Sequence, residues 1–220
     1  APPPSSPPRP GRRVKRHLCG THAVLEALRA RPSDIAVLYV LDASPKGAVG
    51  EVVRAALDRR VAIETTTPAA LDALAGALRH QGVVAVSAGD YPYLDLDTLL
   101  DAVADPARGL LVALDAITDP HNFGAIVRSA VALGADGVIT LRDRAAPVTG
   151  TVVRSSAGAT EHARIARVTN LAQTLARLSD AGWSCVGLAG EADTALDAVD
   201  LTGPTVLVVG SEGDGLRRLV

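Results

Sequence analysis

The segment from residue 110 to residue 141 constrains the fold of this chain more than any other. It reads in order as an apolar strand, a polar turn, a helix and a second apolar strand, over residues 110–114, 115–122, 123–133 and 137–141. Gly134 suits the end of the helix, because a helix stop often needs a left-handed residue and glycine adopts that conformation at little cost. Two strands joined by a helical crossover are parallel. The segment therefore predicts an α/β fold in which the turn lies at the carboxyl edge of a parallel sheet, where such folds bind ligands.

Two polar residues of this segment are unexpected. Arg128 lies in a helix of Ala, Ile and Val, on one helical stripe with Gly124 and Ala132, whose small size leaves space around a guanidinium. Asn122 stands at the helix entrance. A purely structural interpretation remains open, in which Asp119-Pro120 is an N-cap followed by proline at the first helical position, Asn122 supports the cap, and Arg128 is a surface residue.

The N-terminal part predicts a second, smaller α/β unit. Apolar residues predict helices over 23–28 and 49–57 and strands over 35–41, 61–63 and 82–87. Thr67-Pro68 predicts the start of another helix, as N-cap and first position. His17, Cys19 and His22 suggest a metal site, but a fourth ligand is missing nearby and the spacing fits no common zinc pattern. We therefore expect no metal, and a helix entrance at residues 17–22.

After residue 141 the pattern continues as an α/β domain. We expect a segment of small residues over 148–159, a helix from Thr169 to Ser179, and strands over 164–168, 183–188 and 206–209. Glycine-bearing loops follow the last two strands, and glycine lets backbone approach a ligand closely. Neither a Walker motif nor Gly-x-Gly-x-x-Gly after the first strand is present, which disfavours nucleoside triphosphates and dinucleotides as ligands.

Composition narrows the class of protein. Aromatic residues make up 2% of the chain, so Ala, Val and Leu must form the core, as suits a helix-covered parallel sheet. No apolar run approaches the ~18 residues of a membrane span, and we expect no membrane partner. Cys19 and Cys185 provide no disulfide framework, which favours a reducing cytoplasm.

Positive charge is concentrated at the start of the chain. The formal net charge is −2, yet five of the 22 Lys and Arg residues, and none of the 24 Asp and Glu residues, lie in the first 17 positions. We expect residues 1–16 to form a disordered basic tail. Such a tail either contacts RNA phosphates non-specifically or serves as a solubilising extension. The basic residues considered for RNA contact are Arg12, Arg13, Lys15 and Arg16.

Two motifs resemble those of a known family. Asp119-Pro-His-Asn-Phe-Gly-Ala-Ile-Val-Arg-Ser-Ala130 is similar to the first signature of the SpoU/TrmH family, knotted RNA ribose 2′-O-methyltransferases of the SPOUT superfamily. Leu207-Val-Val-Gly-Ser-Glu-Gly-Asp-Gly-Leu216 is similar to the second signature, Gly-x-Glu-x-x-Gly after an apolar strand. The third signature, a proline-rich turn with Ser-Leu-Asn, is not among these 220 residues. We expect the natural chain to extend past both ends, and this chain to bind cofactor weakly.

The resemblance implies a chemistry and a set of residues. The cofactor would be S-adenosylmethionine, held in the knot by Leu188, Ala189, Gly190 and Gly210. Arg128 would position phosphate and stabilise the developing alkoxide, since a guanidinium stays protonated and is a poor base. Asn122 would orient Arg128 or the ribose. Glu212 would fix its loop by accepting backbone N–H bonds or by pairing with an arginine, unless it is only a solvated turn carboxylate.

Arg154 precedes a run of small residues, Ser-Ser-Ala-Gly-Ala159, that the family often carries. We consider two interpretations. Either the loop approaches RNA, with Arg154 on a phosphate, or its Ala and Gly residues allow close helix packing.

The resemblance also implies a domain plan. Gly20-Thr-His-Ala-Val-Leu-Glu-Ala-Leu28 and His80-Gln-Gly-Val-Val-Ala85 resemble the small α/β RNA substrate-binding domain of the subfamily that methylates a guanosine ribose in 23S ribosomal RNA. That domain would cover residues 17–88. Residues 89–108 would be a linker, and residues 109–220 a parallel-sheet α/β-knot methyltransferase domain that lacks its last knot segment. The family implies a homodimer. The alternatives are the tRNA guanosine 2′-O-methyltransferase of the same family and a non-catalytic RNA-binding protein that keeps the fold.

Overall fold

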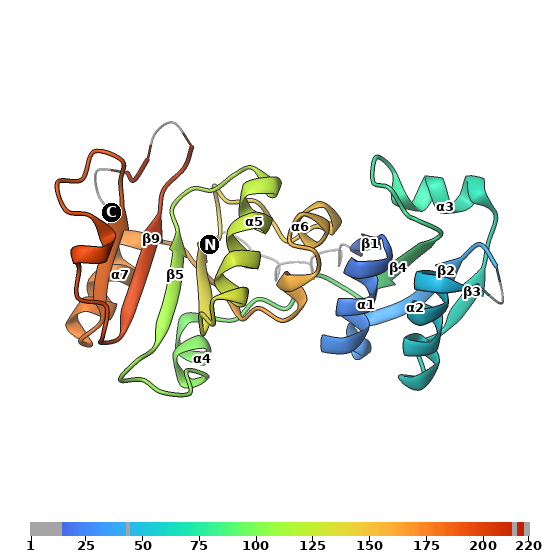
Figure 1. The fold of residues 1–220 in the computed structure, drawn as a ribbon, viewed down its shortest axis with the longest axis horizontal. Coiled ribbons are helices and arrows are strands. Elements are labelled where there is room, and N and C mark those ends of the chain that lie inside the picture. Colours follow the sequence, from blue (N-terminus) through green and yellow to red (C-terminus); the bar gives the residue numbers. More distant parts are fainter. Residues whose placement is uncertain (1–14, 43–44, 213–214, 218–220) are drawn as a thin grey trace, which may run out of the picture.

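The structure, a computed structural model, describes residues 15–42, 45–212 and 215–217. Figure 1 shows an elongated molecule with a sheet toward each end. The N-terminal part contains the elements β1 (His17–Cys19), α1 (Thr21–Ala30), η1 (Pro32–Asp34), β2 (Ile35–Val40), α2 (Gly47–Asp58), β3 (Ile63–Thr65), α3 (Pro68–Ala75) and β4 (Val83–Ser87). The C-terminal part contains α4 (Leu96–Asp101), β5 (Leu110–Leu114), α5 (Pro120–Ala132), β6 (Gly137–Leu141), α6 (Gly150–Ser155), η2 (Ala159–Glu161), β7 (Ile165–Val168), α7 (Leu171–Asp180), β8 (Ser184–Leu188), η3 (Leu196–Ala198) and β9 (Thr205–Val209).

The N-terminal sheet is mixed, with strand order β1-β4-β2-β3. The expectation of a helix entrance at residues 17–22 is wrong for its first half, because His17–Cys19 is a strand antiparallel to β4. Helix α1 begins only at Thr21, after Gly20 has turned the chain with a φ of 96°. Thr67 caps α3 as predicted, and its hydroxyl accepts a hydrogen bond from the Ala70 amide.

The C-terminal sheet is parallel throughout, in the order β7-β6-β5-β9-β8. This confirms the predicted parallel α/β domain. Strands β5 and β6 have the predicted bounds, and α5 ends just before Gly134, which takes the left-handed φ of 81°. The predicted cap of α7 is wrong: the side chain of Asn170, and not Thr169, accepts the hydrogen bond from the Gln173 amide.

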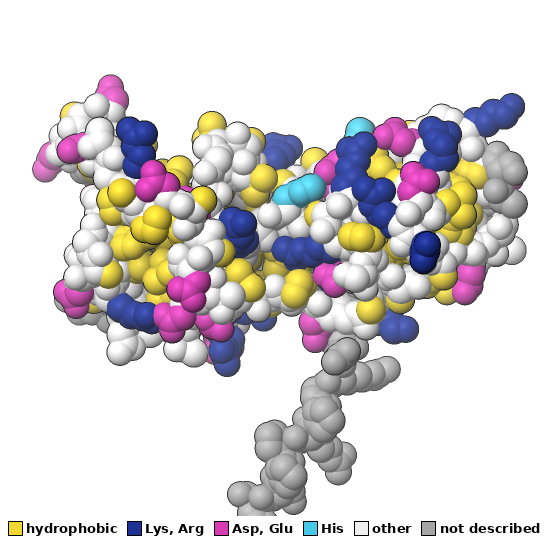
Figure 2. Space-filling view, turned by 90° about the horizontal axis from the view of Figure 1, so that it is seen from below, with side chains coloured by type: hydrophobic (Ala, Val, Ile, Leu, Met, Phe, Trp, Pro, Cys, Tyr) yellow, Lys and Arg dark blue, Asp and Glu magenta, His cyan; other side chains and the backbone are white. Residues whose placement is uncertain are grey.

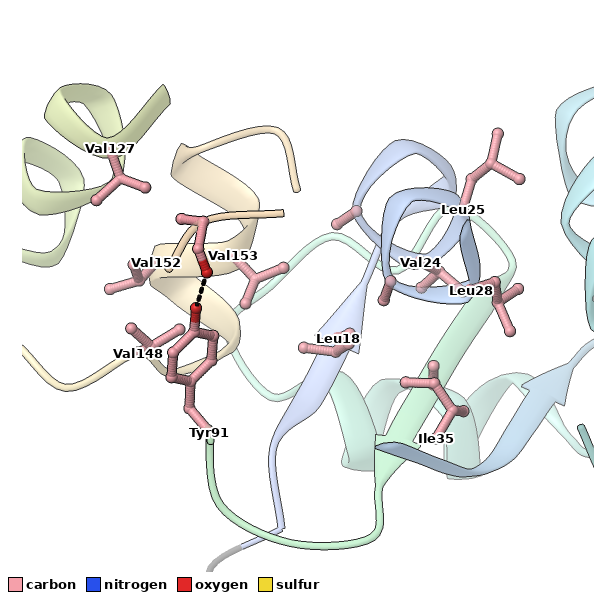
Figure 3. Close-up of a cluster of buried hydrophobic side chains, with 14 of the residues drawn as sticks. Leu18, Val24, Leu25, Leu28, Ile35, Tyr91, Val127, Val148, Val152 and Val153 are labelled. Carbon is pink, nitrogen blue, oxygen red and sulfur yellow. Dashed lines mark hydrogen bonds between the residues drawn. The ribbon is translucent and has the colours of Figure 1, made fainter. Parts of the chain in front are cut away.

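One apolar cluster crosses from the N-terminal part into the C-terminal part. Figure 3 shows Leu18, Val24 and Leu28 on one side and Val152 and Val153 on the other. Tyr91 lies beside Val148 and Val152 (Figure 3), and its hydroxyl donates a hydrogen bond to the Ala163 carbonyl oxygen at 2.9 Å. The two parts are therefore packed together through a shared core.

Glycines allow the close approach at this junction. A Cβ on Gly150 would lie 2.0 Å from the carbonyl oxygen of His17, and one on Gly158 would lie 2.6 Å from the Glu26 Cβ. Gly158 also has a left-handed φ of 86°. This agrees with the packing interpretation of the small residues after Arg154.

A buried ion pair joins the same two parts. The Arg16 guanidinium lies 2.7 Å from the Glu161 carboxylate, and the two side chains are 5% and 0% exposed. The prediction that Arg16 belongs to a free basic tail is therefore wrong. The Glu161 charge holds Arg16 in the interior, because a buried cation needs a partner.

The connection between the two parts also completes the C-terminal sheet. Leu94 forms a parallel bridge with Ala166 on the outer edge of β7, and its amide donates to the Ile165 carbonyl oxygen at 2.9 Å. The preceding residue, Tyr93, lies under the Arg167 guanidinium, 3.5 Å from ring centroid to Cζ. The connection is thus held against β7 by backbone and side-chain contacts.

Candidate active site

The turn after β5 brings the first motif to the carboxyl edge of the parallel sheet. Asp119 caps α5, and its carboxylate accepts a hydrogen bond from the His121 amide at 2.8 Å. Pro120 occupies the first helical turn, where a missing N–H costs nothing. Helix α5 buries Phe123 and Val127 and packs against α6. The capping prediction is confirmed, and the cap fixes where the helix begins.

Arg128 lies on the outer side of α5. It is exposed, and within the described residues it takes part in no ion pair or hydrogen bond. Gly124 on the same stripe is buried instead, since a Cβ there would lie 1.9 Å from the Ser155 hydroxyl oxygen. The space expected around the guanidinium is therefore open solvent, and Gly124 serves helix packing.

Asn122 and Glu212 remain separate from Arg128. Asn122 is half-buried, Glu212 is exposed, and no hydrogen bond joins the three side chains in the portion of the chain with described positions. No side-chain hydrogen bond of Glu212 stabilises its own loop there either. This position fits the solvated turn carboxylate considered above.

Asp115 has the role that was expected of Glu212, which is to fix the second motif loop by accepting a backbone N–H bond and pairing with an arginine. Its side chain is fully buried directly after β5, and its carboxylate accepts hydrogen bonds from the Arg217 amide at 2.9 Å and from Arg217 Nε at 2.6 Å. Its own amide donates to the Val209 carbonyl oxygen. Asp115 thereby ties the loop after β9 to the end of β5. This pair was not predicted, although a carboxylate directly after a buried strand is a usable signal of such a contact.

A hollow of about 660 Å³ lies along β8 and the segment after it. Its walls include three of the residues predicted to hold a cofactor, Leu188, Ala189 and Gly190, and contain no charged side chain. Nothing lies within 4 Å of a Cβ placed on Gly190, so its backbone is open to a ligand. Gly210 does not line this hollow. A Cβ on Gly210 would lie 2.2 Å from the backbone of Gly215, so it allows the loop to close on itself.

Arg154 faces the N-terminal part of the molecule. Its Nη1 donates a hydrogen bond to the Arg79 carbonyl oxygen at 2.7 Å. Burial raises the pKa of the nearby Cys19 thiol to about 11, and the positive charge of Arg154 opposes that rise. One guanidinium nitrogen is thus already used in joining the two parts.

The remaining predicted RNA contacts lie at the start of the chain. Lys15 is exposed, whereas Arg12 and Arg13 lie outside the described residues. In the part of the chain that the structure covers, no group of three or more His, Cys, Asp or Glu side chains could hold a metal ion. No helix among those residues is long and apolar enough to cross a membrane.

Comparison with known proteins places both parts of the chain. Residues 109–220 match the family model of the SpoU rRNA Methylase family, and residues 17–92 match that for RNA 2′-O ribose methyltransferase substrate binding. A protein named an uncharacterized tRNA/rRNA methyltransferase, from Mycolicibacterium smegmatis, is 46% identical over 202 residues, which cover 91% of this chain and 64% of the relative. One of the same name from Mycobacterium avium is 42% identical over 218 residues, covering 98% and 70%. The chain thus spans 64% of the length of the first of these curated relatives.

Solved structures agree with these matches. The SpoU methyltransferase AviRb from Streptomyces viridochromogenes, in complex with the cofactor AdoMet, has a TM-score of 0.74 and 27% identity over 93% of this chain and 76% of that one. An AdoMet-bound rRNA methyltransferase from Sinorhizobium meliloti has a TM-score of 0.69 and 25% identity over 92% and 73%. Because a family model covers half of the sequence and both signature motifs follow strands of one parallel sheet, the chain belongs to the SpoU rRNA methylase family.

Proposed function

We propose that this protein transfers a methyl group from S-adenosylmethionine to a ribose 2′-hydroxyl of RNA. The observation that carries the proposal is the arrangement of the two signature motifs, on the loops after the adjacent strands β5 and β9 of the parallel sheet. The match of residues 17–92 to a substrate-binding family model supports RNA as the substrate. We further propose that the target is a guanosine of 23S rRNA and that the protein acts in the cytoplasm. In this proposal residues 17–88 bind the RNA, residues 89–108 form a linker, and residues 109–220 carry out methyl transfer.

The hollow along β8 fits the proposed cofactor. Its volume of about 660 Å³ lies within the range of pockets that enclose small ligands, ~300–1,000 Å³. Leu188 and Ala189 offer apolar contacts, and the open backbone at Gly190 offers amide and carbonyl groups for a polar ligand. The cofactor, when bound, supplies an electrophilic methyl group on a sulfonium. Gly210 contributes by letting the second motif loop fold tightly.

Arg128 is proposed to act on the RNA side of the reaction. Its exposed guanidinium has no ion-pair partner among the described residues, so it is free to donate to a phosphate or to the ribose oxygen. A guanidinium is permanently protonated and cannot act as a base. It stabilises negative charge on the attacking oxygen, and Asn122 at the helix entrance orients the ribose. Glu212 is exposed on the second motif loop and makes no side-chain hydrogen bond among the described residues, so no part in the reaction is proposed for it.

Substitution of Arg128 tests this assignment. Arg128→Ala should lower single-turnover methyl transfer by on the order of 10²–10³, as for the loss of one electrostatic donor. Arg128→Lys should be nearly as slow, because an ammonium cannot reproduce the planar fork. The matched control is Arg108→Ala, another exposed arginine, which precedes β5 at the opposite edge of the sheet.

The assay follows the transfer of labelled methyl from S-adenosylmethionine to rRNA and, in parallel, to tRNA. Parental rates in both folded Arg128 variants would remove this residue from the mechanism. Methyl transfer to tRNA but not to rRNA would show that the target is a tRNA and not 23S rRNA. Absence of transfer to any RNA, with RNA still bound, would favour a non-catalytic RNA-binding protein.

A further inference from the structure

Two hollows near the junction of the two parts have walls that are rich in Lys and Arg side chains. The first, of about 820 Å³, lies between β1, α3, the connecting segment and the start of α6. The second, of about 390 Å³, lies where β7 ends and α7 begins. Arg167 lines both, so they adjoin. We call the two hollows together the basic groove, because its charged wall residues are Lys15, Arg16, Arg142, Arg167 and Arg177 with the single acid Asp90.

This charge is not a property of the whole chain. Overall, 24 acidic residues outnumber 22 basic ones, yet the groove holds five basic residues and one acid. The hollow along β8 has no charged wall residue. Lys and Arg side chains also gather over the middle of the face seen in Figure 2, where the two parts meet. Positive charge is thus concentrated at the junction and not at the proposed cofactor site.

Among the described residues, three of the five cations have no acidic partner. Arg16 pairs with Glu161 and Arg177 with Asp97. Within residues 15–42, 45–212 and 215–217, Lys15, Arg142 and Arg167 form no ion pair. Arg167 instead stacks on the Tyr93 ring, with its Cζ 3.5 Å from the ring centroid. Cations without an acidic partner leave the wall positively charged, which favours an anionic ligand.

The groove leads toward the candidate active site. Its first hollow begins beside β1 of the substrate-binding part. Its second hollow reaches Arg142, the residue directly after β6. The Arg142 amide donates a hydrogen bond to the Val168 carbonyl oxygen at the end of β7. Strand β6 is the neighbour of β5, from which the loop runs to α5. A chain of phosphates lying in the groove would therefore run from the N-terminal sheet to the edge that carries Asn122.

We propose that the basic groove binds the sugar-phosphate backbone of single-stranded RNA, with Lys15, Arg142 and Arg167 each contacting a phosphate. This rests on the proposed function, which makes RNA the substrate. Arginine donates to phosphate oxygens in a planar fork, and cationic grooves that follow the backbone are how proteins bind single strands. A hollow of 820 Å³ has the volume of a small-ligand pocket, so it admits one or two nucleotides and not a duplex.

The test measures binding alone, on the full chain and without cofactor. Fluorescence anisotropy with a labelled single-stranded oligouridine, repeated at several salt concentrations, gives the affinity and the slope of log K against log salt. Each of Lys15→Gln, Arg142→Gln and Arg167→Gln should weaken binding severalfold and reduce the slope by about 0.7, the value for one phosphate contact on a single strand. Arg108→Gln, with the same charge change at the opposite edge of the sheet, should bind like the parent.

The outcomes separate this proposal from the proposed function. Parental slopes and affinities in Lys15→Gln and Arg142→Gln, whose side chains are exposed and do not support the fold, would overturn the groove while leaving RNA methylation intact. An equal loss in Arg108→Gln would show only a general charge effect and would also overturn it. A parent that binds no oligouridine and methylates no RNA would overturn both proposals.

Discussion

The buried pair of Arg16 and Glu161 gives the sharpest test of how the two parts are joined. We expect Arg16→Met to destabilise the protein strongly, because the change leaves the Glu161 carboxylate in the interior without its cation. Methionine keeps the unbranched apolar stem but removes the guanidinium, whose Cζ lies 5.2 Å from the Tyr91 ring centroid, so this cation–π contact is lost as well. The double variant Arg16→Met/Glu161→Gln removes both charges and should recover much of the loss.

The magnitude follows from burial. The two side chains are 5% and 0% exposed, so water and salt screen them little. Breaking a buried pair by removing one partner costs about 3–5 kcal/mol of unfolding free energy. The pairs of Arg29 with Glu26 and Glu51 are a matched contrast, because Arg29 is 48% exposed. Arg29→Met should cost no more than about 1 kcal/mol, as for exposed pairs.

Urea unfolding followed by circular dichroism measures these differences, with Arg16→Met, Glu161→Gln, the double variant and Arg29→Met compared in one buffer. High salt should leave the cost of Arg16→Met nearly unchanged. A loss for Arg16→Met as small as that for Arg29→Met would refute the claim that this pair is desolvated. A double variant less stable than Arg16→Met alone would refute the claim that the uncompensated carboxylate causes the loss.

Four further predictions test other features. Gly150→Ala places a Cβ 2.0 Å from a carbonyl oxygen of β1 and should cost about 1–3 kcal/mol in thermal unfolding, whereas Gly190→Ala, with nothing within 4 Å, should be tolerated. Asp115→Ala leaves Arg217 without its acceptor, and hydrogen exchange of residues 210–212 should accelerate if that contact holds the loop. Burial raises the pKa of Tyr91 to about 12, so the folded state holds this proton more tightly. The stability advantage of the parent over Tyr91→Phe should then shrink as the pH rises from about 10 to about 12. Light scattering should give a homodimer, and a mass near the 22.5 kDa of a single chain would count against dimerisation.

Local pattern was enough to predict the central strand–turn–helix–strand unit. Its signals lie within one stretch: apolar runs for the strands, Asp119-Pro120 for the helix start and Gly134 for its end. Strand β1 could not be read in this way. It is three residues long and is stabilised by pairing with β4, where His17 lies opposite Val86.

Long-range partners decide the features that were missed. Arg16 has the sequence surroundings of a solvated basic tail, and only Glu161, 145 residues later, makes it an interior residue. Asp115 and Arg217 are 102 residues apart and meet because β5 and β9 are neighbours in the sheet. Pairwise charge contacts of this kind depend on strand order, which composition and periodicity do not determine.

The connecting segment has a consequence for how the protein can be divided. The substrate-binding family model ends at residue 92 and the methylase family model begins at residue 109, so neither includes Leu94. Yet Leu94 forms a parallel bridge with Ala166 on the outer edge of β7 and pairs there with the backbone of Ile165 and Arg167. A catalytic fragment cut at residue 109 would expose the amides and carbonyls of that edge, and unprotected edge strands pair with other chains. Both this fragment and one cut before Tyr93 lack the N-terminal side of the shared core, but only the first also lacks Leu94. We therefore expect the fragment cut at residue 109 to self-associate more strongly, so the natural unit of the C-terminal part begins inside the connection.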